Sequence, residues 1–342
     1  MEYEEIFMQR ALELARYGRG KVSPNPMVGC VIVYEGQIIG EGYHKKYGEA
    51  HAEVNAVRSV REPEKLKEST LYVTLEPCSH FGKTPPCADL IIQHKIPKVV
   101  VATTDPNPQV AGRGLKKLTE AGVEVYTGVH EKEAQELNKR FFTQILQKRP
   151  YIILKWAETA DGFIARDNYD SKWISDWYSR KLVHRWRSEE DAILVGGNTA
   201  KYDDPKLNVR SWTGRNPIRI VIDRTLQLNK ELHLFDGSQL TLCFNEQKTE
   251  KQDQLEYIQL ADCHDPRQLI QGLRDYPIQS LIVEGGSAVL HSFLQAGLWD
   301  ELRVFKSKTT FGSGIPAPHP MGCLVQQEQL LNDHLYIYRK DT

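Results

Sequence analysis

The sequence predicts an α/β protein made of two domains, and three observations support this. Segments with helical spacing of apolar residues alternate with short apolar runs that are typical of strands, which favours a layered α/β fold. The 342 residues exceed the usual length of one domain. The pattern also changes near 147–150, where a helical segment ends at a basic cluster and a proline. We therefore expect domains over 1–146 and 147–342.

The first half alternates helical and strand patterns in a way that indicates a mixed sheet. Its expected elements are a helix over 5–17, strands over 29–33 and 38–42 that pair across a Glu-Gly turn, a helix over 51–61, a strand over 70–75, a helix that opens at Cys87, a strand over 99–103 and a helix over 133–146. His51 and Cys87 would thus begin two different helices.

The second half alternates again, with strands expected over 151–155, 192–196, 218–223 and 281–283. The last strand leads through Glu284 and the pair Gly285-Gly286 into a helix over 288–296. Two glycines let backbone amides approach an anion at a helix start, so this turn is a candidate phosphate cradle. The signal is weak alone, and no Gly-x-Gly-x-x-Gly or Walker pattern supports an ordinary Rossmann or P-loop site.

Composition and charge narrow the class of protein. The formal net charge is −1, from 44 basic and 45 acidic residues, which argues against a nucleic-acid or anionic-membrane partner. The six cysteines are scattered, as in a protein of the reducing cytoplasm. The first residues are acidic where a secretory leader would be basic and then apolar, and no apolar run is long enough for a membrane span. We expect a cytoplasmic protein.

Four residues predict a zinc site with an unligated carboxylate beside it. His51 and Glu53 form a His-x-Glu motif, Cys78 follows a strand and a proline, and Cys87 follows two prolines at the start of a helix. A helix N-terminus favours the negative charge of a thiolate. This ordered set is the signature of zinc deaminases that act on nucleobases, with His51, Cys78 and Cys87 as the ligands.

The ligand set also predicts the chemistry. Two thiolates and one imidazole leave zinc less electrophilic than three histidines would, so a nearby base is valuable. Glu53 lies two positions after a ligand and can take a proton from the attacking water without occupying the metal. We assign Glu53 as the catalytic shuttle, which protonates a ring nitrogen as hydroxide attacks the amine-bearing carbon and then protonates the departing ammonia.

Two further segments carry candidate substrate contacts. Eight residues separate the cysteines, where the short signature has two, and His80 and Lys83 in this stretch either meet the substrate or belong to a solvated loop. His80 is also a spare ligand, although catalytic zinc normally keeps three protein ligands. Asn25 lies in a Ser-Pro-Asn-Pro turn, where its amide either stabilises the turn or contacts substrate.

Nearly the full chain resembles the bifunctional riboflavin-biosynthesis deaminase/reductase family. The resemblance is strongest over 1–145, and the long gap between the cysteines is typical of it. The matching segments are Pro24-Asn25-Pro26, Gly42-Tyr43-His44, His51-Ala52-Glu53, the run from Thr74 to His80, Pro86-Cys87, and the run from Asp105-Pro106-Asn107-Pro108 to Gly112-Arg113-Gly114. The resemblance implies a cytidine-deaminase-like α/β/α domain over 1–146 and a dihydrofolate-reductase-like α/β domain over 147–342. It also implies Zn²⁺ and NADPH as cofactors and a homo-oligomer, either dimer or tetramer.

The family's reductase positions also have counterparts in the second half. Matching residues include Lys155, Ala157, Asp161-Gly162, Ile174, Asp204-Pro205 and those assigned below. By similarity, the nicotinamide cofactor would be lined by Ala157, Trp173, Thr199, Asp203, Gly286, Ser287, Ala288, Val289, Leu290, His291 and Ser292. The phosphoribosyl substrate would be held by Ser171, Arg187, Leu207, Arg210 and Glu284. Two arginines suit bidentate contact with a phosphate.

The second half departs from the family's pattern at three places. Ser175 stands where a threonine usually follows Trp-Ile, and Thr159-Ala160 replaces the common Ser-Leu. Arg224 stands where a small hydroxyl residue near the cofactor is usual. Arg224 either pairs with the 2′-phosphate of NADPH or covers the rim of the site.

The leading hypothesis is a two-step enzyme. The first domain would deaminate 2,5-diamino-6-ribosylamino-4(3H)-pyrimidinone 5′-phosphate, and the second would reduce the ribosyl group to ribityl. One alternative keeps the deaminase but gives it another base, nucleoside or tRNA adenosine, with the second half as a binding module. Another is a zinc-stabilised structural protein without catalysis, which would lose nothing measurable if Glu53 became Gln.

Overall fold

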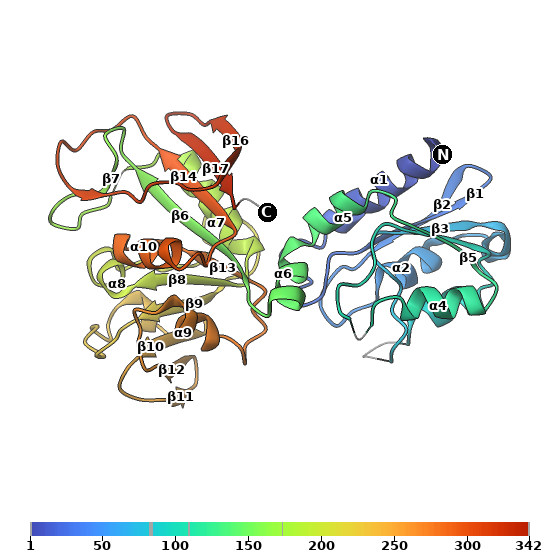
Figure 1. Ribbon diagram of the computed structural model, residues 1–342, viewed down its shortest axis with the longest axis horizontal. Coiled ribbons are helices and arrows are strands. Elements are labelled where there is room, and N and C mark those ends of the chain that lie inside the picture. The colour runs from blue at the N-terminus through green and yellow to red at the C-terminus, as the bar shows by residue number, and fades with distance from the viewer. Residues whose placement is uncertain (1, 82–84, 109, 173, 341–342) are drawn as a thin grey trace. The chain divides into compact units, whose positions relative to one another are not determined.

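The computed structural model describes residues 2–81, 85–108, 110–172 and 174–340. The chain forms two compact units, Met1–Lys148 and Arg149–Thr342, and each is described by itself (Figure 1). None of the helices in the described part of the chain is long and apolar enough to cross a membrane.

The first unit is a five-stranded mixed sheet between two layers of helices (Figure 1). Strands β2, β1 and β3 are antiparallel, and β3, β4 and β5 are parallel. In sheet order the strands are β2 (Gln37–Tyr43), β1 (Gly29–Tyr34), β3 (Thr70–Val73), β4 (Lys98–Val101) and β5 (Glu124–Thr127). The mixed sheet and the hairpin across Glu35-Gly36 are confirmed.

Alternation of side chains along β1 explains the two helical layers. Val31 and Val33 pack on one face with α1 (Glu2–Arg16) and α5 (Glu131–Leu137). Cys30 and Ile32 face the other way. On that second face the sheet is covered by α2 (Ala52–Ser59), α3 (Cys87–Gln93) and α4 (Arg113–Glu120), with the short 3₁₀ helix η1 (Pro63–Glu68) beside them. The expected α/β/α arrangement is confirmed.

The helix expected over 133–146 is instead two helices, α5 and α6 (Lys139–Gln147), and that prediction was wrong. Asn138 lies between them, 2% exposed, with φ −103° and ψ 21°. Its side chain accepts a hydrogen bond from the Met27 amide at 2.8 Å and donates one to the Met27 carbonyl at 2.9 Å. Asn138 thus satisfies the backbone hydrogen bonds of a distant residue. The spacing of apolar residues in the sequence cannot reveal such a contact.

The second unit is built on a ten-stranded sheet whose central strands, from β12 to β14, are parallel. In sheet order the strands are β11 (Glu250–Gln252), β12 (Leu255–Gln259), β10 (Thr241–Asn245), β9 (Ile218–Ile222), β8 (Ala192–Gly196), β13 (Ser280–Val283), β6 (Tyr151–Glu158), β14 (Glu301–Lys306), β17 (His334–Arg339) and β16 (Cys323–Gln329). A separate pair consists of β7 (Phe163–Ala165) and β15 (Ile315–Pro316).

Helices cover both faces of this sheet. Ile152 and Leu154 of β6 pack in the core that includes residues of α9 (Pro266–Gln271) and α10 (Ser287–Gln295). Ile153 packs on the opposite face with α7 (Trp177–Glu189), and α8 (Gly197–Asp203) covers the same face beside β8. The 3₁₀ helix η2 (His233–Phe235) completes the described helices. The strands expected near 151, 192, 218 and 281 are all present and lie side by side.

Candidate active sites

The predicted ligands of the first unit lie together at two helix N-termini. His51 is the N-cap residue of α2 and Cys87 is the first residue of α3. The His51 Nδ1 atom lies 3.6 Å from the Cys78 Sγ atom and 3.3 Å from the Cys87 Sγ atom. Among the described residues, these three form a group whose ligand atoms all lie within 4.8 Å of one another. The sequence-based expectation that two helix starts converge here is confirmed.

These atoms fit a tetrahedral zinc ion. Ligands bound at about 2.3 Å for sulfur and about 2.0 Å for nitrogen would lie about 3.5 Å apart. A hydrogen bond with Cys87 and contact with His51 lower the pKa of Cys78 even though burial opposes this. The Cys87 amide also donates to the Cys78 sulfur at 3.3 Å. The donor set therefore suits a thiolate-rich site for Zn²⁺.

Glu53 lies in the first turn of α2 and is 3% exposed. Burial and the negative charge of Cys78 raise the pKa of Glu53 to about 7, while its hydrogen bond with Cys87 acts in the opposite direction. A carboxyl group with a pKa near neutral can both accept and return a proton, which is the property that a general acid/base needs.

Asn25 reaches the cluster through a second histidine. The Asn25 Nδ2 atom lies 3.2 Å from the Nε2 atom of His44, and the other ring nitrogen of His44 is 3.1 Å from the Ala50 carbonyl. The ring of His44 meets that of His51 edge-on at 5.5 Å. Burial lowers the pKa of His44, so a neutral ring that donates to Ala50 and accepts from Asn25 accounts for both contacts.

Glu76 anchors the loop behind Cys78. Its buried carboxylate accepts hydrogen bonds from the backbone amides of Asp105, Gly112 and Gly114, at 3.2, 2.9 and 2.9 Å. A Cβ atom on Gly114 would lie 2.0 Å from the Pro77 carbonyl oxygen, so only glycine fits there. Asp105, Gly112 and Gly114 of the family-like segment are therefore held against the start of the Pro-Cys motif. His80 is exposed, and Lys83 lies outside the described residues.

The second unit contains a cavity of about 1560 Å³ at the carboxyl ends of its parallel strands. Its lining includes Lys155 to Ala157 of β6, Gly196 at the end of β8, Ile222 at the end of β9 and Glu284 after β13. The size exceeds that of an ordinary drug-sized pocket, so a dinucleotide and a second ligand can occupy it together.

A buried ion pair lies on the floor of this cavity. Arg187 donates from Nε and Nη2 to the two carboxylate oxygens of Glu284, at 3.0 and 2.7 Å. The Lys155 ammonium lies 3.9 Å from Glu284. Burial raises the pKa of Glu284, but the charges of Arg187 and Lys155 outweigh it and lower that pKa to about 2. Burial lowers the pKa of Lys155.

Arg187 and Arg210 were predicted to hold a phosphate, and they meet different surroundings. Arg187 is committed to Glu284, whereas Arg210 is exposed and donates to the Asn208 side chain at 3.2 Å. Burial and the charge of Arg187 lower the pKa of Arg210, and both side chains line the cavity. Two repelling cations at a cavity wall favour an anionic ligand.

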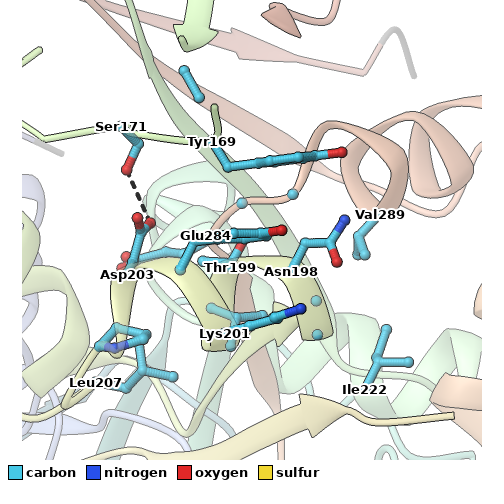
Figure 2. A pocket seen from close by; sticks show the side chains of 18 of the residues that line it. Tyr169, Ser171, Asn198, Thr199, Lys201, Asp203, Leu207, Ile222, Glu284 and Val289 are labelled. Carbon is cyan, nitrogen blue, oxygen red and sulfur yellow. Dashed lines mark hydrogen bonds between the residues drawn. The ribbon is translucent and has the colours of Figure 1, made fainter. Parts of the chain in front are cut away.

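The loop before α7 closes one side of the cavity. The Ser171 hydroxyl donates to the Asp203 carboxylate at 2.9 Å, and Figure 2 shows this bond with Thr199, Lys201 and Asp203 projecting from α8. Tyr169 stacks on Tyr202 with ring centroids 4.7 Å apart. Helix α8 is thus joined to the loop through both a polar contact and an aromatic one.

The other predicted cofactor and substrate residues differ in their placement. Those that line the cavity are Ala157, Ser171, Arg187, Thr199, Asp203, Leu207, Arg210, Glu284, Gly286, Ser287, Ala288, Val289 and Ser292. Leu290 is instead fully buried in the core of the unit. His291 is not among the lining residues, and its Nδ1 atom lies 2.8 Å from the Ser287 carbonyl. Trp173 lies outside the described residues.

Comparison with known proteins identifies the family. Residues 1–103 match the cytidine and deoxycytidylate deaminase zinc-binding region, and residues 150–333 match the RibD C-terminal domain. The riboflavin biosynthesis protein RibD of Aquifex aeolicus (strain VF5) is 44% identical over 320 residues, covering 92% of this chain and 89% of that protein. The chain belongs to the RibD family. The RibD protein of Escherichia coli (strain K12) is 41% identical over 330 residues, covering 91% and 89% of the two chains.

A solved RibD-family structure agrees over the whole length. It is a diaminohydroxyphosphoribosylaminopyrimidine deaminase/5-amino-6-(5-phosphoribosylamino)uracil reductase from Thermotoga maritima, 40% identical, with a TM-score of 0.91 and 99% of each chain covered. Membership confirms a bifunctional deaminase and reductase of riboflavin biosynthesis, with a zinc-binding deaminase domain and a reductase domain that uses a nicotinamide cofactor.

Sequence reasoning gave no role to several residues that the structure brings to these sites. Lys155 was matched only as a family position, and its strand gave no sign that its ammonium would face Glu284. His44 and Glu76 lie in family-like motifs, yet they form contacts with residues 19 and 36 positions away in the chain. A polar residue inside an otherwise apolar strand or motif is the signal that could have found them.

Proposed function

We propose that the first unit deaminates 2,5-diamino-6-ribosylamino-4(3H)-pyrimidinone 5′-phosphate and that the second reduces the product to 5-amino-6-ribitylamino-uracil 5′-phosphate with NADPH. On this proposal, residues 1–146 carry the deaminase and 147–342 the reductase. The observation that supports it is the presence of two candidate sites in one chain: the His51, Cys78 and Cys87 cluster in the first unit, and the large cavity around Glu284 in the second.

In the first site, His51, Cys78 and Cys87 would hold Zn²⁺. The ion, when bound, supplies the Lewis acidity that makes water a nucleophile at neutral pH. Glu53 takes up the first water proton and passes it to the ring nitrogen beside the amine-bearing carbon. It then carries the second proton, from the hydroxyl group now on that carbon, to the amino group, which leaves as ammonia while the carbonyl forms. Its burial supports this, because a dry carboxyl group returns the proton readily. Asn25, held by His44, and His80 and Lys83 of the 79–86 loop would contact the pyrimidine.

In the second site, NADPH would, when bound, supply a hydride to C1′ of the ribosyl group. Opening of the sugar ring requires a proton at the ring oxygen, and the Lys155 ammonium is a buried donor on the cavity wall. Glu284 keeps Lys155 and Arg187 in place through its ion pairs and accepts from a ribose hydroxyl. Arg210 would contact the phosphate directly, and Arg187, which stays paired with Glu284, would help to bind it through its positive charge. Ser171 and Leu207 would flank the substrate.

The cofactor is expected along α8 and the start of α10. Thr199 and Asp203 lie on α8, and Gly286 has a φ of 73°, which lets the backbone turn tightly into α10. Ala157, Trp173 and the run from Gly286 to Ser292 complete the proposed lining, with Leu290 and His291 acting through packing. Preference for NADPH over NADH is supported by Arg224, which lines the same cavity and is held loosely by Glu246 at 3.7 Å.

The remaining expectations concern the protein's surroundings. We propose a cytoplasmic enzyme, because the six cysteines are scattered along the sequence and two of them are proposed metal ligands. A homo-oligomer, dimer or tetramer, stays a prediction that sedimentation can measure.

One coupled assay tests the proposed function. Purified protein is given the phosphoribosyl diaminopyrimidinone with NADPH, and ammonia release, NADPH oxidation and bound zinc are measured in the same sample. We expect ammonia first and NADPH oxidation only after it. Ammonia release without NADPH oxidation would contradict the reductase assignment alone, and equal rates with cytidine or guanine would favour a deaminase of different specificity.

A further inference from the structure

The cavity wall beside Arg210 contains a buried histidine that the proposed reaction does not use. His184 lies on α7, one turn before Arg187, and both residues line the cavity because positions three apart on a helix share a face. The side chain of His184 is 4% exposed. A buried imidazole is costly unless its nitrogens have partners, so its contacts indicate what it does.

The contacts of α7 hold an irregular segment of chain. The backbone amide of Arg210 donates to the Nδ1 atom of His184 at 3.4 Å. One turn along the helix, the Nη1 atom of Arg187 donates to the Asn208 carbonyl, also at 3.4 Å. Residues 208–210 belong to no helix or strand. Their position therefore depends on such contacts more than on a regular backbone ladder.

The backbone that leads into this segment is strained. Asp204 has a φ of 40° and Leu207 a φ of 48°, in the left-handed region that residues other than glycine rarely adopt. Leu207 is 1% exposed and packs with the core beneath α8. Such a conformation persists only where its surroundings hold it. The two bonds from α7 secure the far side of the segment, next to the Arg210 side chain.

The surroundings of the ring keep it neutral. The groups that act on its charge are Arg187 on α7, Arg210 and the Asn208 backbone on the segment, and Glu284 after β13. Burial and the charges of Arg187 and Arg210 lower the pKa of His184 to about 4, against smaller opposite effects of Asn208 and Glu284. A neutral imidazole keeps a lone pair on Nδ1 to accept the Arg210 amide, whereas an imidazolium has none.

We propose that His184 is a positioning residue for binding of the substrate's phosphate, because its ring fixes the backbone at Arg210 and so directs the Arg210 guanidinium. The inference rests on the proposed function, which assigns Arg187 and Arg210 to that phosphate. His184 acts through Arg210 and makes no contact with the anion.

Two substitutions at this position test the role. His184→Phe keeps a ring of similar size without an acceptor, and His184→Asn restores an amide oxygen close to the former Nδ1. The affinity for ribose 5-phosphate is measured by calorimetry on the full-length protein, and the reductase KM and kcat are measured beside it. We expect the Phe variant to weaken ribose 5-phosphate binding and raise the KM for the phosphoribosyl substrate, each by about 3- to 10-fold, the usual worth of one hydrogen bond. The kcat and the KM for NADPH should stay within about twofold, and the Asn variant should recover most of the affinity.

The outcomes separate this inference from the function on which it rests. Arg210→Ala is measured in parallel, and if it leaves ribose 5-phosphate binding unchanged, the phosphate assignment fails and the inference with it. If Arg210→Ala weakens binding but His184→Phe does not, the inference alone fails. A fall in kcat with KM unchanged in the Phe variant would also overturn it.

A measurement on the unsubstituted protein covers the case in which the Phe variant does not fold. In protein labelled with ¹⁵N-histidine, the His184 resonances at pH 7 should show a neutral ring with its proton on Nε2. A charged ring, or a proton on Nδ1, would overturn the inference, because neither form can accept the Arg210 amide.

Discussion

Replacing Glu284 by Gln should destabilise the second unit by about 3 kcal/mol at neutral pH. The pKa of Glu284 lies at about 2 in place of its ordinary 4.5, and one pKa unit is worth about 1.4 kcal/mol. The side chains of Arg187 and Glu284 are only 11% and 8% exposed, so solvent screens the pair little. The magnitude agrees with the roughly 3–5 kcal/mol lost when one partner of a buried ion pair is removed.

The pH dependence gives this prediction a second, independent part. Because the folded-state pKa is depressed, the stabilisation is fully present above about pH 5 and is lost as the pH falls through the folded pKa. The difference between wild type and Glu284→Gln should therefore shrink to about half by pH 3 and vanish near pH 2. Below that pH the wild-type carboxyl is itself neutral, so the two proteins carry the same charge beside Arg187.

Urea unfolding followed by tryptophan fluorescence measures this directly. All six tryptophans fall within residues 149–342 of the sequence, so the signal reports on the second unit. Glu250→Gln is the matched control, because Glu250 pairs with Lys248 on the exposed surface of the same unit, and no measurable change is expected. A loss below about 1 kcal/mol at pH 7, or a difference that stays constant down to pH 3, would refute the reasoning.

Three further predictions concern the first unit. Glu53→Gln should lower ammonia release by about 10²- to 10⁴-fold without affecting NADPH oxidation on supplied aminouracil substrate, and equal losses in both assays would contradict separate sites. Cys87→Ser should reduce bound zinc and ammonia release together, as measured by metal analysis, whereas a full zinc content would remove Cys87 from the ligand set. Glu76→Ala should leave three backbone amides unpaired and destabilise the first unit by about 2 kcal/mol or more, seen as faster hydrogen exchange over 103–114; unchanged exchange would contradict the anchoring role.

Local patterns were sufficient to predict much of the fold. Eight strands were expected, because a short apolar run bounded by turn residues is typical of a strand. They begin near residues 29, 38, 70, 99, 151, 192, 218 and 281. The helix over 133–146 failed for a tertiary reason: Asn138 interrupts it to bind the backbone of Met27, 111 residues away. Strands β5, β7, β10 to β12 and β14 to β17 were not predicted. Three of them, β11, β16 and β17, meet the ten-stranded sheet through antiparallel pairs near its edges.

The sequence by itself determined the chemistry of the first site. The order of His51, Glu53, Cys78 and Cys87 predicts ligands and base, because metal chemistry depends on residue types and on which helices they begin. Only the tertiary structure decided how the reductase cavity is arranged. In the folded chain Arg187 pairs with Glu284, and the Lys155 ammonium lies 3.9 Å from the same carboxylate. The Arg210 backbone amide donates to His184. These residues come from α7, β6 and the segments that follow α8 and β13. Their charges interact strongly only after folding brings them together and excludes water, because the interaction between charges is weak in water.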